Sequence, residues 1–180
     1  MTDHHAADPG PRQMAEADAR EAKAKFAEAK ADGAIAAGLD AGGEVLTTLG
    51  LDDAANQAFA EAGNERAAEQ RAVLEGAAHL LAADQWSAAA HDLKEQAHLT
   101  GDAFAAGGLA RGAQDTLGGG SELADARRTE LELQAASEAA RQEVFTQRAA
   151  EMGEEAAEDA ARAEDLDRAV HAMEEADTAP

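Results

Sequence analysis

The chain of 180 residues contains no cysteine and no tyrosine, and it has three prolines and a single isoleucine. Without cysteine it can form no disulfide and no thiolate metal site, and it carries no cysteine nucleophile. Residues that favour β-strands are scarce, and no stretch alternates apolar and polar side chains with a period of two, which excludes a β-sheet. These absences predict an all-α fold.

Large apolar side chains are also in short supply. Of the 81 apolar residues 52 are alanine, which leaves 29 larger ones. Alanine has the highest helix propensity, but its methyl group buries little surface when helices pack. We therefore expect elongated alanine-rich helices, arranged as a hairpin or a loose bundle with a glycine-rich hinge. Because such packing yields little free energy, we expect oligomeric assembly to stabilise it.

Positive charge is the third shortage. The chain has 15 Lys and Arg against 37 Asp and Glu, which gives a net charge of -22. Such a surface repels phosphate, so we expect no sequence-specific binding to nucleic acid. Two interpretations of the charge remain open. It serves solubility or adaptation to salt, or it belongs to a surface that lies beside packaged DNA without adhering to it.

Membrane-spanning and secretory segments are not expected. No stretch of 18 residues is free of charge, and the N-terminal residues lack the basic and apolar regions of a secretory signal. Gly38 and Gly42 lie four residues apart on one helix face, which permits close approach of another backbone. Asp40 and Glu44 interrupt this segment and would be costly in hydrocarbon, so the corner of a helical hairpin is favoured over membrane contact.

Composition divides the chain into four segments. Proline and glycine near the N-terminus indicate a tail, and glycine enrichment in the middle indicates a hinge. Between Glu151 and Asp177 eleven acids face two arginines, so the C-terminal end is expected to be solvated or frayed. The predicted segments are a flexible N-terminal tail (1–13), a helical hairpin (14–100), a glycine-rich hinge (101–121) and a long acidic helix with a frayed end (122–180).

The second helix of the hairpin is predicted to run from Asp52 to about Leu99. Its larger apolar residues recur with helical spacing, so we expect them to form the buried face. The two expected stripes are Val73, Ala77, Leu80 and Leu81, and Trp86, Ala90, Leu93 and Ala97.

Assembly and hinge contacts are assigned to the single tryptophan and to glycines. No other aromatic residue lies within ten residues of Trp86, which favours a helix contact over a ligand platform. Glycine enters positive φ freely and weakens helices, which suits a hinge. The candidate residues are Gly38, Gly42, Trp86, Gly107, Gly108, Gly118, Gly119 and Gly120.

No catalytic or metal-ligating constellation is predicted. Glu95 and His98 form one Glu-x-x-His, the half-motif that di-metal bundles use twice, and one such match is expected by chance among 21 Glu and six His. Paired carboxylates near Glu154 read as a solvated helix face, since the chain has little with which to build an apolar pocket. We therefore expect no enzyme activity, metal, cofactor or small-molecule substrate.

The stretch from Leu93 to about Arg162 resembles a known family. Its successive features are an alanine-rich helix through Phe104-Ala105-Ala106-Gly107-Gly108, the turn Gly118-Gly119-Gly120-Ser121, then Leu123-Ala124 and a helix with Glu130, Leu131, Leu133, Phe145 and Ala149-Ala150. This order is similar to that of the internal virion (ejection) proteins of short-tailed bacteriophages. The resemblance implies a location inside the capsid near the portal, release ahead of the genome and a part in a conduit across the host envelope.

The leading hypothesis is a non-enzymatic virion component that assists genome delivery. Its implied partners are further copies of the chain and other virion proteins of the portal or tail, and contact with a membrane is left open. Its implied location is the virion, then the host envelope after ejection, and otherwise the cytoplasm. The alternatives are an acidic scaffolding or adaptor protein of a particle, and a secreted helical-hairpin protein of a bacterial export system.

Overall fold

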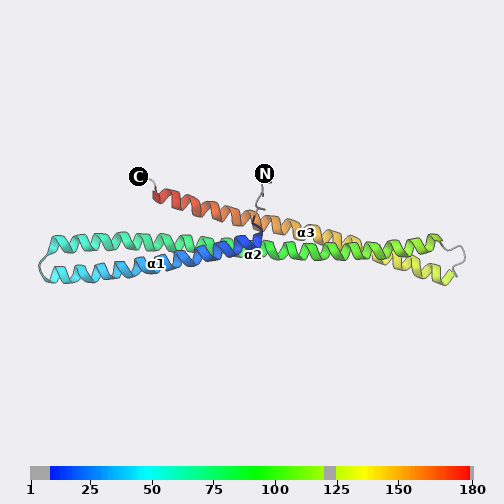
Figure 1. The fold of residues 1–180 in the computed structure, drawn as a ribbon, viewed down its shortest axis with the longest axis horizontal. Coiled ribbons are helices and arrows are strands. Elements are labelled where there is room, and N and C mark those ends of the chain that lie inside the picture. Colours follow the sequence, from blue (N-terminus) through cyan, green and yellow to red (C-terminus); the bar gives the residue numbers. More distant parts are fainter. Residues whose placement is uncertain (1–8, 120–124, 179–180) are drawn as a thin grey trace, which may run out of the picture. The chain divides into compact units, whose positions relative to one another are not determined.

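The computed structural model describes residues 9–119 and 125–178, which form three helices (Figure 1). Helix α1 spans Pro11–Thr48, α2 spans Asp52–Gly119 and α3 spans Asp125–Thr178. No strand occurs in the two described ranges, so the predicted all-α fold is confirmed there. Within them, no helix has a stretch long and apolar enough to cross a membrane.

The described residues divide into two compact units, to which α2 and α3 both contribute. The first, here called the hairpin unit, comprises 9–87 and 160–178. Figure 1 shows α1, in blue to cyan, beside the first part of α2. The contacts of Lys25 with Glu75 and Glu174 and of Asp18 with His79 give the directions of the helices. α1 and the end of α3 are parallel, and both are antiparallel to α2.

The second unit, here called the two-helix unit, comprises residues 88–159. The later part of α2 and the first part of α3 lie side by side in it (Figure 1). Ala113 of α2 packs against Leu131 and Ala135 of α3. Gly107 of α2 faces Gln142, so the two helices are antiparallel.

Local sequence explains both ends of α1. Proline is favoured in the first turn of a helix, and Pro11 follows Gly10, so the helix begins inside the segment predicted to be a tail. At the other end Gly50 adopts φ +73°, which glycine tolerates. The amides of Leu51 and Gly50 donate to the carbonyls of Leu46 and Thr47, both at 3.0 Å, the pattern of a Schellman cap. The hairpin corner therefore lies at 49–51, beyond Gly38 and Gly42, which lie inside α1.

Alanine occupies the contact faces of the helices at every seventh residue. A seven-residue repeat is the signature of helices that supercoil around each other, and small side chains let the axes approach to the short end of the usual range of about 8–10 Å. In α1 the buried column is Ala15, Ala22, Ala29 and Ala36, continued by Gly43. In the two-helix unit the columns include Ala103 and Ala110, Ala106 and Ala113, and Ala149 and Ala156.

The larger apolar residues lie mostly outside these columns. Of the 21 apolar residues that are buried in the described part of the chain, 18 are alanine, and the exceptions are Trp86, Leu131 and Val170. The stripe expected around Leu80 is therefore wrong, because Leu80 is 54% exposed and Val73 is 43% exposed. An alanine face brings the helices close together, so most of the larger apolar side chains project from its flanks.

The predicted hinge over 101–121 is not confirmed in its described part. Residues 101–119 continue α2 as a regular helix, 20 residues beyond the expected end at Leu99. A glycine in a helix is less favourable than alanine by about 0.5–1 kcal/mol, and packing of neighbouring residues such as Ala106 and Ala110 overrides that preference. Gly120 and Ser121 lie outside the described residues.

The C-terminal end of α3 differs from the frayed end that its acidity predicted. The helix continues to Thr178, and its last part packs in the hairpin unit. Ala163 is 0% exposed and Val170 is 2% exposed. These two residues are seven apart, so the contact face of this segment is apolar even though its other faces carry many carboxylates.

Gly43→Ala is expected to lower the free energy of unfolding by about 1–2 kcal/mol. The new Cβ would lie 2.6 Å from Cε1 of Phe59, and overpacking of about 1–3 kcal/mol exceeds the gain of about 0.5–1 kcal/mol from leaving glycine. Gly42→Ala is the matched control, because its Cβ would meet nothing within 4 Å. It is expected to raise stability by about 0.5–1 kcal/mol. Urea unfolding followed by circular dichroism measures the free energy of unfolding of both variants. Changes of the same sign in the two variants would contradict the close packing of Phe59 on Gly43.

Candidate functional site

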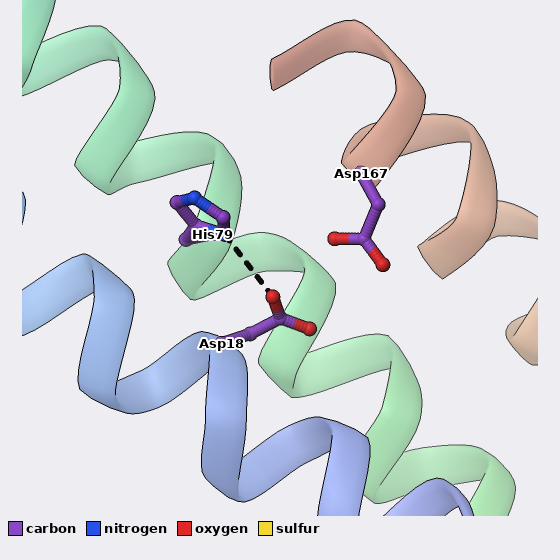
Figure 2. A group of neighbouring side chains, drawn as sticks. All are labelled: Asp18, His79 and Asp167. Atoms are coloured by element: carbon purple, nitrogen blue, oxygen red, sulfur yellow. Dashed lines mark hydrogen bonds and ion pairs between the residues drawn. The ribbon is translucent and has the colours of Figure 1, made fainter. Parts of the chain in front are cut away.

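Polar side chains from three helices meet inside the hairpin unit. Asp18 comes from α1, His79 from α2 and Asp167 from α3, and Figure 2 shows all three turned toward one space. Nδ1 of His79 lies 3.1 Å from Oδ1 of Asp18. One ligand-type atom from each of the three residues lies within 4.8 Å of the others. We call this group the Asp–His–Asp cluster.

The Asp–His–Asp cluster is shielded from solvent. The side chain of Asp18 is 9% exposed and that of His79 is 13% exposed. Oδ2 of Asp18 and Oδ1 of Asp167 are buried without a hydrogen-bond partner among the described residues. The other oxygen of Asp167 accepts a hydrogen bond from Nε1 of Trp86 at 3.4 Å. A buried polar group left without a partner costs about 1–3 kcal/mol, and more when it is charged.

Burial raises the pKa of Asp18 above its ordinary 3.8. The hydrogen bond with His79 acts in the opposite direction, and the negative charge of Asp167 raises the pKa further. Two carboxyl groups therefore share a poorly hydrated space with one imidazole. A cation or a proton held between the carboxyl groups would relieve the repulsion.

A second polar group joins the same three helices. Nζ of Lys25 lies 2.6 Å from Oε2 of Glu75 and 3.3 Å from Oε1 of Glu174. Glu75 is almost completely buried, and its hydrogen bond with Lys25 is the main cause that raises the pKa of Lys25 above 10.5. The contact stabilises the protonated amine and thereby links α1, α2 and α3.

Stability is expected to fall in alkaline solution as Lys25 loses its proton. Because its pKa is higher in the folded than in the unfolded chain, its contribution is complete below pH 10.5 and is lost as the pH rises through the folded pKa. No tyrosine or cysteine titrates over the same range. Lys25→Arg keeps its charge to above about pH 12, so its unfolding midpoint should change less than that of the wild type between about pH 10 and 12. An equal loss of stability in both proteins over this pH range would show that groups other than Lys25 cause it.

An apolar patch lies on the side of the hairpin away from α3. Glu75 of α2 contacts Lys25, which also contacts Glu174 of α3, so Glu75 marks the side of α2 nearer to α3. Val73 and Leu80 project roughly 140–160° around the α2 axis from Glu75. The ring of Phe26 covers Gly76 between them, and Leu80 and Leu81 line a shallow hollow with alanines of α1. We call Phe26, Val73, Leu74, Leu80 and Leu81 the apolar face. Their exposed fractions are 40%, 43%, 61%, 54% and 56%.

The structure separates the residues assigned to assembly and hinge contacts. Trp86 packs between Ala15 and Ala163 in the hairpin unit, and Gly107 faces the side chain of Gln142 in the two-helix unit. A Cβ would meet nothing within 4 Å at Gly38, Gly42, Gly108, Gly118 and Gly119, and Gly120 lies outside the described residues. A role for these glycines in contacts with other molecules stays a prediction.

The sequence did not single out the Asp–His–Asp cluster. The signal that could have found it is the seven-residue alanine column, because Asp18 lies between Ala15 and Ala22 on the same face of α1. His79 likewise lies between Gly76 and Ala83, both buried. A carboxylate and an imidazole at such positions are candidates for a buried polar contact.

The chain was also compared with known proteins. No protein-family model, no curated protein and no solved structure matches it.

Proposed function

We propose that the chain is a non-enzymatic structural component of a bacteriophage virion, in which several copies assemble near the portal or tail and assist genome delivery. The observation that supports assembly most directly is that alanines fill the interior while most large apolar side chains are exposed to solvent. Fifteen large apolar side chains among the described residues are at least 38% exposed, whereas three are buried. Exposed apolar groups that lie together mark surfaces for other molecules.

The apolar face is the proposed contact between copies, and charge supports a second copy as its occupant. Helix α1 carries five Lys or Arg and seven Asp or Glu, whereas α3 carries six and sixteen. Helix α1 is thus nearly neutral and α3 is strongly negative, while α2, which supplies four residues of the apolar face, carries four Lys or Arg and eleven Asp or Glu. Packing that brings α1 and the apolar face of one copy against an acidic helix of another avoids most of the repulsion between chains of this charge.

Three further considerations support the virion setting. Residues 93–162 resemble internal virion proteins of short-tailed phages in the order of their alanine- and glycine-rich features. Helices held by alanine gain little free energy per contact, so partial separation during passage through a narrow tail would be inexpensive. A strongly negative surface would also let DNA pass without adhering.

Sedimentation of the purified chain tests the assembly. We expect particles of several times 18.5 kDa at micromolar concentration. Leu80→Ser with Leu81→Ser should weaken association at least tenfold while circular dichroism stays unchanged. Leu133→Ser is the matched control, because Leu133 is 67% exposed but lies outside the apolar face. A stable, compact monomer of the wild-type chain would exclude the proposal.

The virion setting has its own test. Mass spectrometry of mature phage particles should detect the chain at a fixed number of copies. A scaffolding protein would be present in assembly intermediates and absent from finished particles. Detection in culture supernatant without particles would instead favour a secreted helical hairpin.

A further inference from the structure

We propose that Asp18, His79 and Asp167 bind one divalent transition-metal ion, with zinc the best fit, and that this ion joins the three helices of the hairpin unit. Each helix supplies one ligand, and the three residues are far apart in the sequence (Figure 2). The proposal does not depend on the virion function, because it concerns the interior of one chain.

The donor set favours zinc. An imidazole nitrogen suits zinc, iron, nickel and copper, and carboxylate oxygens bind zinc as well as harder ions. The ligand atoms around tetrahedral zinc lie about 3.3 Å apart, given bonds of about 2.0–2.1 Å. The nitrogen of His79 and the oxygen of Asp18 are already 3.1 Å apart, and all three ligand atoms lie within 4.8 Å.

The unpartnered oxygens point to a cation as well. Asp18 is 6% exposed, yet its Oδ2 has no hydrogen-bond partner among the described residues, and neither has Oδ1 of Asp167. Two carboxylates that face each other in a poorly hydrated interior repel strongly. A divalent ion between the two carboxyl groups would neutralise both charges and give each group a ligand contact. A water molecule would complete the fourth position, as in zinc sites with three protein ligands.

Trp86 supports the third ligand. Its Nε1 donates to Oδ2 of Asp167 while the indole packs against Ala163 of the same helix. The contact fixes one oxygen of the carboxyl group and leaves Oδ1 for the metal. Groups that hold a ligand in this way commonly raise metal affinity about 10–100-fold. The single tryptophan also gives a fluorescent reporter beside the site.

Titration of the full chain with zinc after removal of metals by chelation tests the site. The sequence also contains His4 and His5, so the measurement uses the variant His4→Ala with His5→Ala as its background. Calorimetry should show one ion per chain. At a free zinc concentration 100 times Kd, the unfolding temperature should rise by about 5–10 °C. Cobalt bound at the same site should give the visible spectrum of a tetrahedral ion and quench the fluorescence of Trp86.

Variants locate the ion. His79→Ala and Asp167→Asn should each weaken zinc binding at least tenfold and abolish the rise in unfolding temperature. The control is His98→Ala, because His98 is exposed and lies 3.9 Å from Asp102, another histidine–aspartate pair. It should bind zinc like its background. If a ligand variant fails to fold, the cobalt spectrum of the background protein still shows whether a tetrahedral ion is bound.

Two outcomes would overturn the proposal. One is the absence of stoichiometric zinc and cobalt binding in the background protein, which would leave a shared proton between the two carboxyl groups as the alternative. The other is equal affinity in His79→Ala and His98→Ala, which would place the ion on surface carboxylates.

Discussion

Replacing Trp86 with alanine is expected to lower the free energy of unfolding by about 3–5 kcal/mol. Trp86 is 7% exposed and packs between Ala15 of α1 and Ala163 of α3. The buried residues around it are alanines with Met14 packed beside them, so the neighbours can fill only part of the space left by the indole. A domain is stable by about 5–15 kcal/mol, so the variant should unfold at a much lower urea concentration. Far-ultraviolet circular dichroism in urea measures the change.

Phe104→Ala provides the comparison for loss of an aromatic ring. Phe104 is 76% exposed, so its removal should change stability by no more than about 0.5 kcal/mol. Trp86→Phe should lie between the two, because a ring remains but the hydrogen bond to Asp167 is lost. Equal effects of the alanine variants would show that the hairpin unit does not depend on Trp86.

Ala62→Leu is expected to destabilise the chain by about 1–3 kcal/mol, although it enlarges an apolar residue at a buried position. Ala62 is 0% exposed and belongs to an alanine column of α2. The added carbons would force the helix axes apart and loosen neighbouring contacts along the hairpin. Thermal unfolding in dilute solution measures the loss.

The matched control is Ala60→Leu, because Ala60 is exposed on the same helix. The two substitutions change composition identically and helix propensity equally, so their difference isolates packing. Ala60→Leu should alter stability by no more than about 0.5 kcal/mol. Stabilisation by Ala62→Leu would mean that the interface has room for larger side chains.

The helical class could be predicted from composition. High alanine content predicted helices, and Asp52 was correctly expected to begin the second one. The buried faces could not be predicted by seeking the largest apolar residues, because two closely packed helices bury their smallest ones. Glycine between 101 and 119 indicated a hinge, but local propensity gave way to tertiary packing.

The Asp–His–Asp cluster shows the same limit. Asp18 and His79 could have been found from the alanine columns that they interrupt. Asp167 likewise lies between the buried residues Ala163 and Val170, but its partners depend on which segment of α3 packs against the hairpin. That choice is a property of the tertiary fold, and the pattern within α3 does not reveal it.

The alanine columns have a consequence for register. A face that repeats one small residue every seven positions is nearly unchanged when a helix slides by one heptad, about 10.5 Å along its axis. The polar contacts remove that ambiguity. Sliding α1 one way would set Asp18 against Glu75, and sliding it the other way would bring Lys25 beside His79. Each misalignment places like charges together or leaves a charge buried without a partner. Asp18 and Lys25, seven residues apart, therefore fix the register of α1 that the alanines alone do not determine.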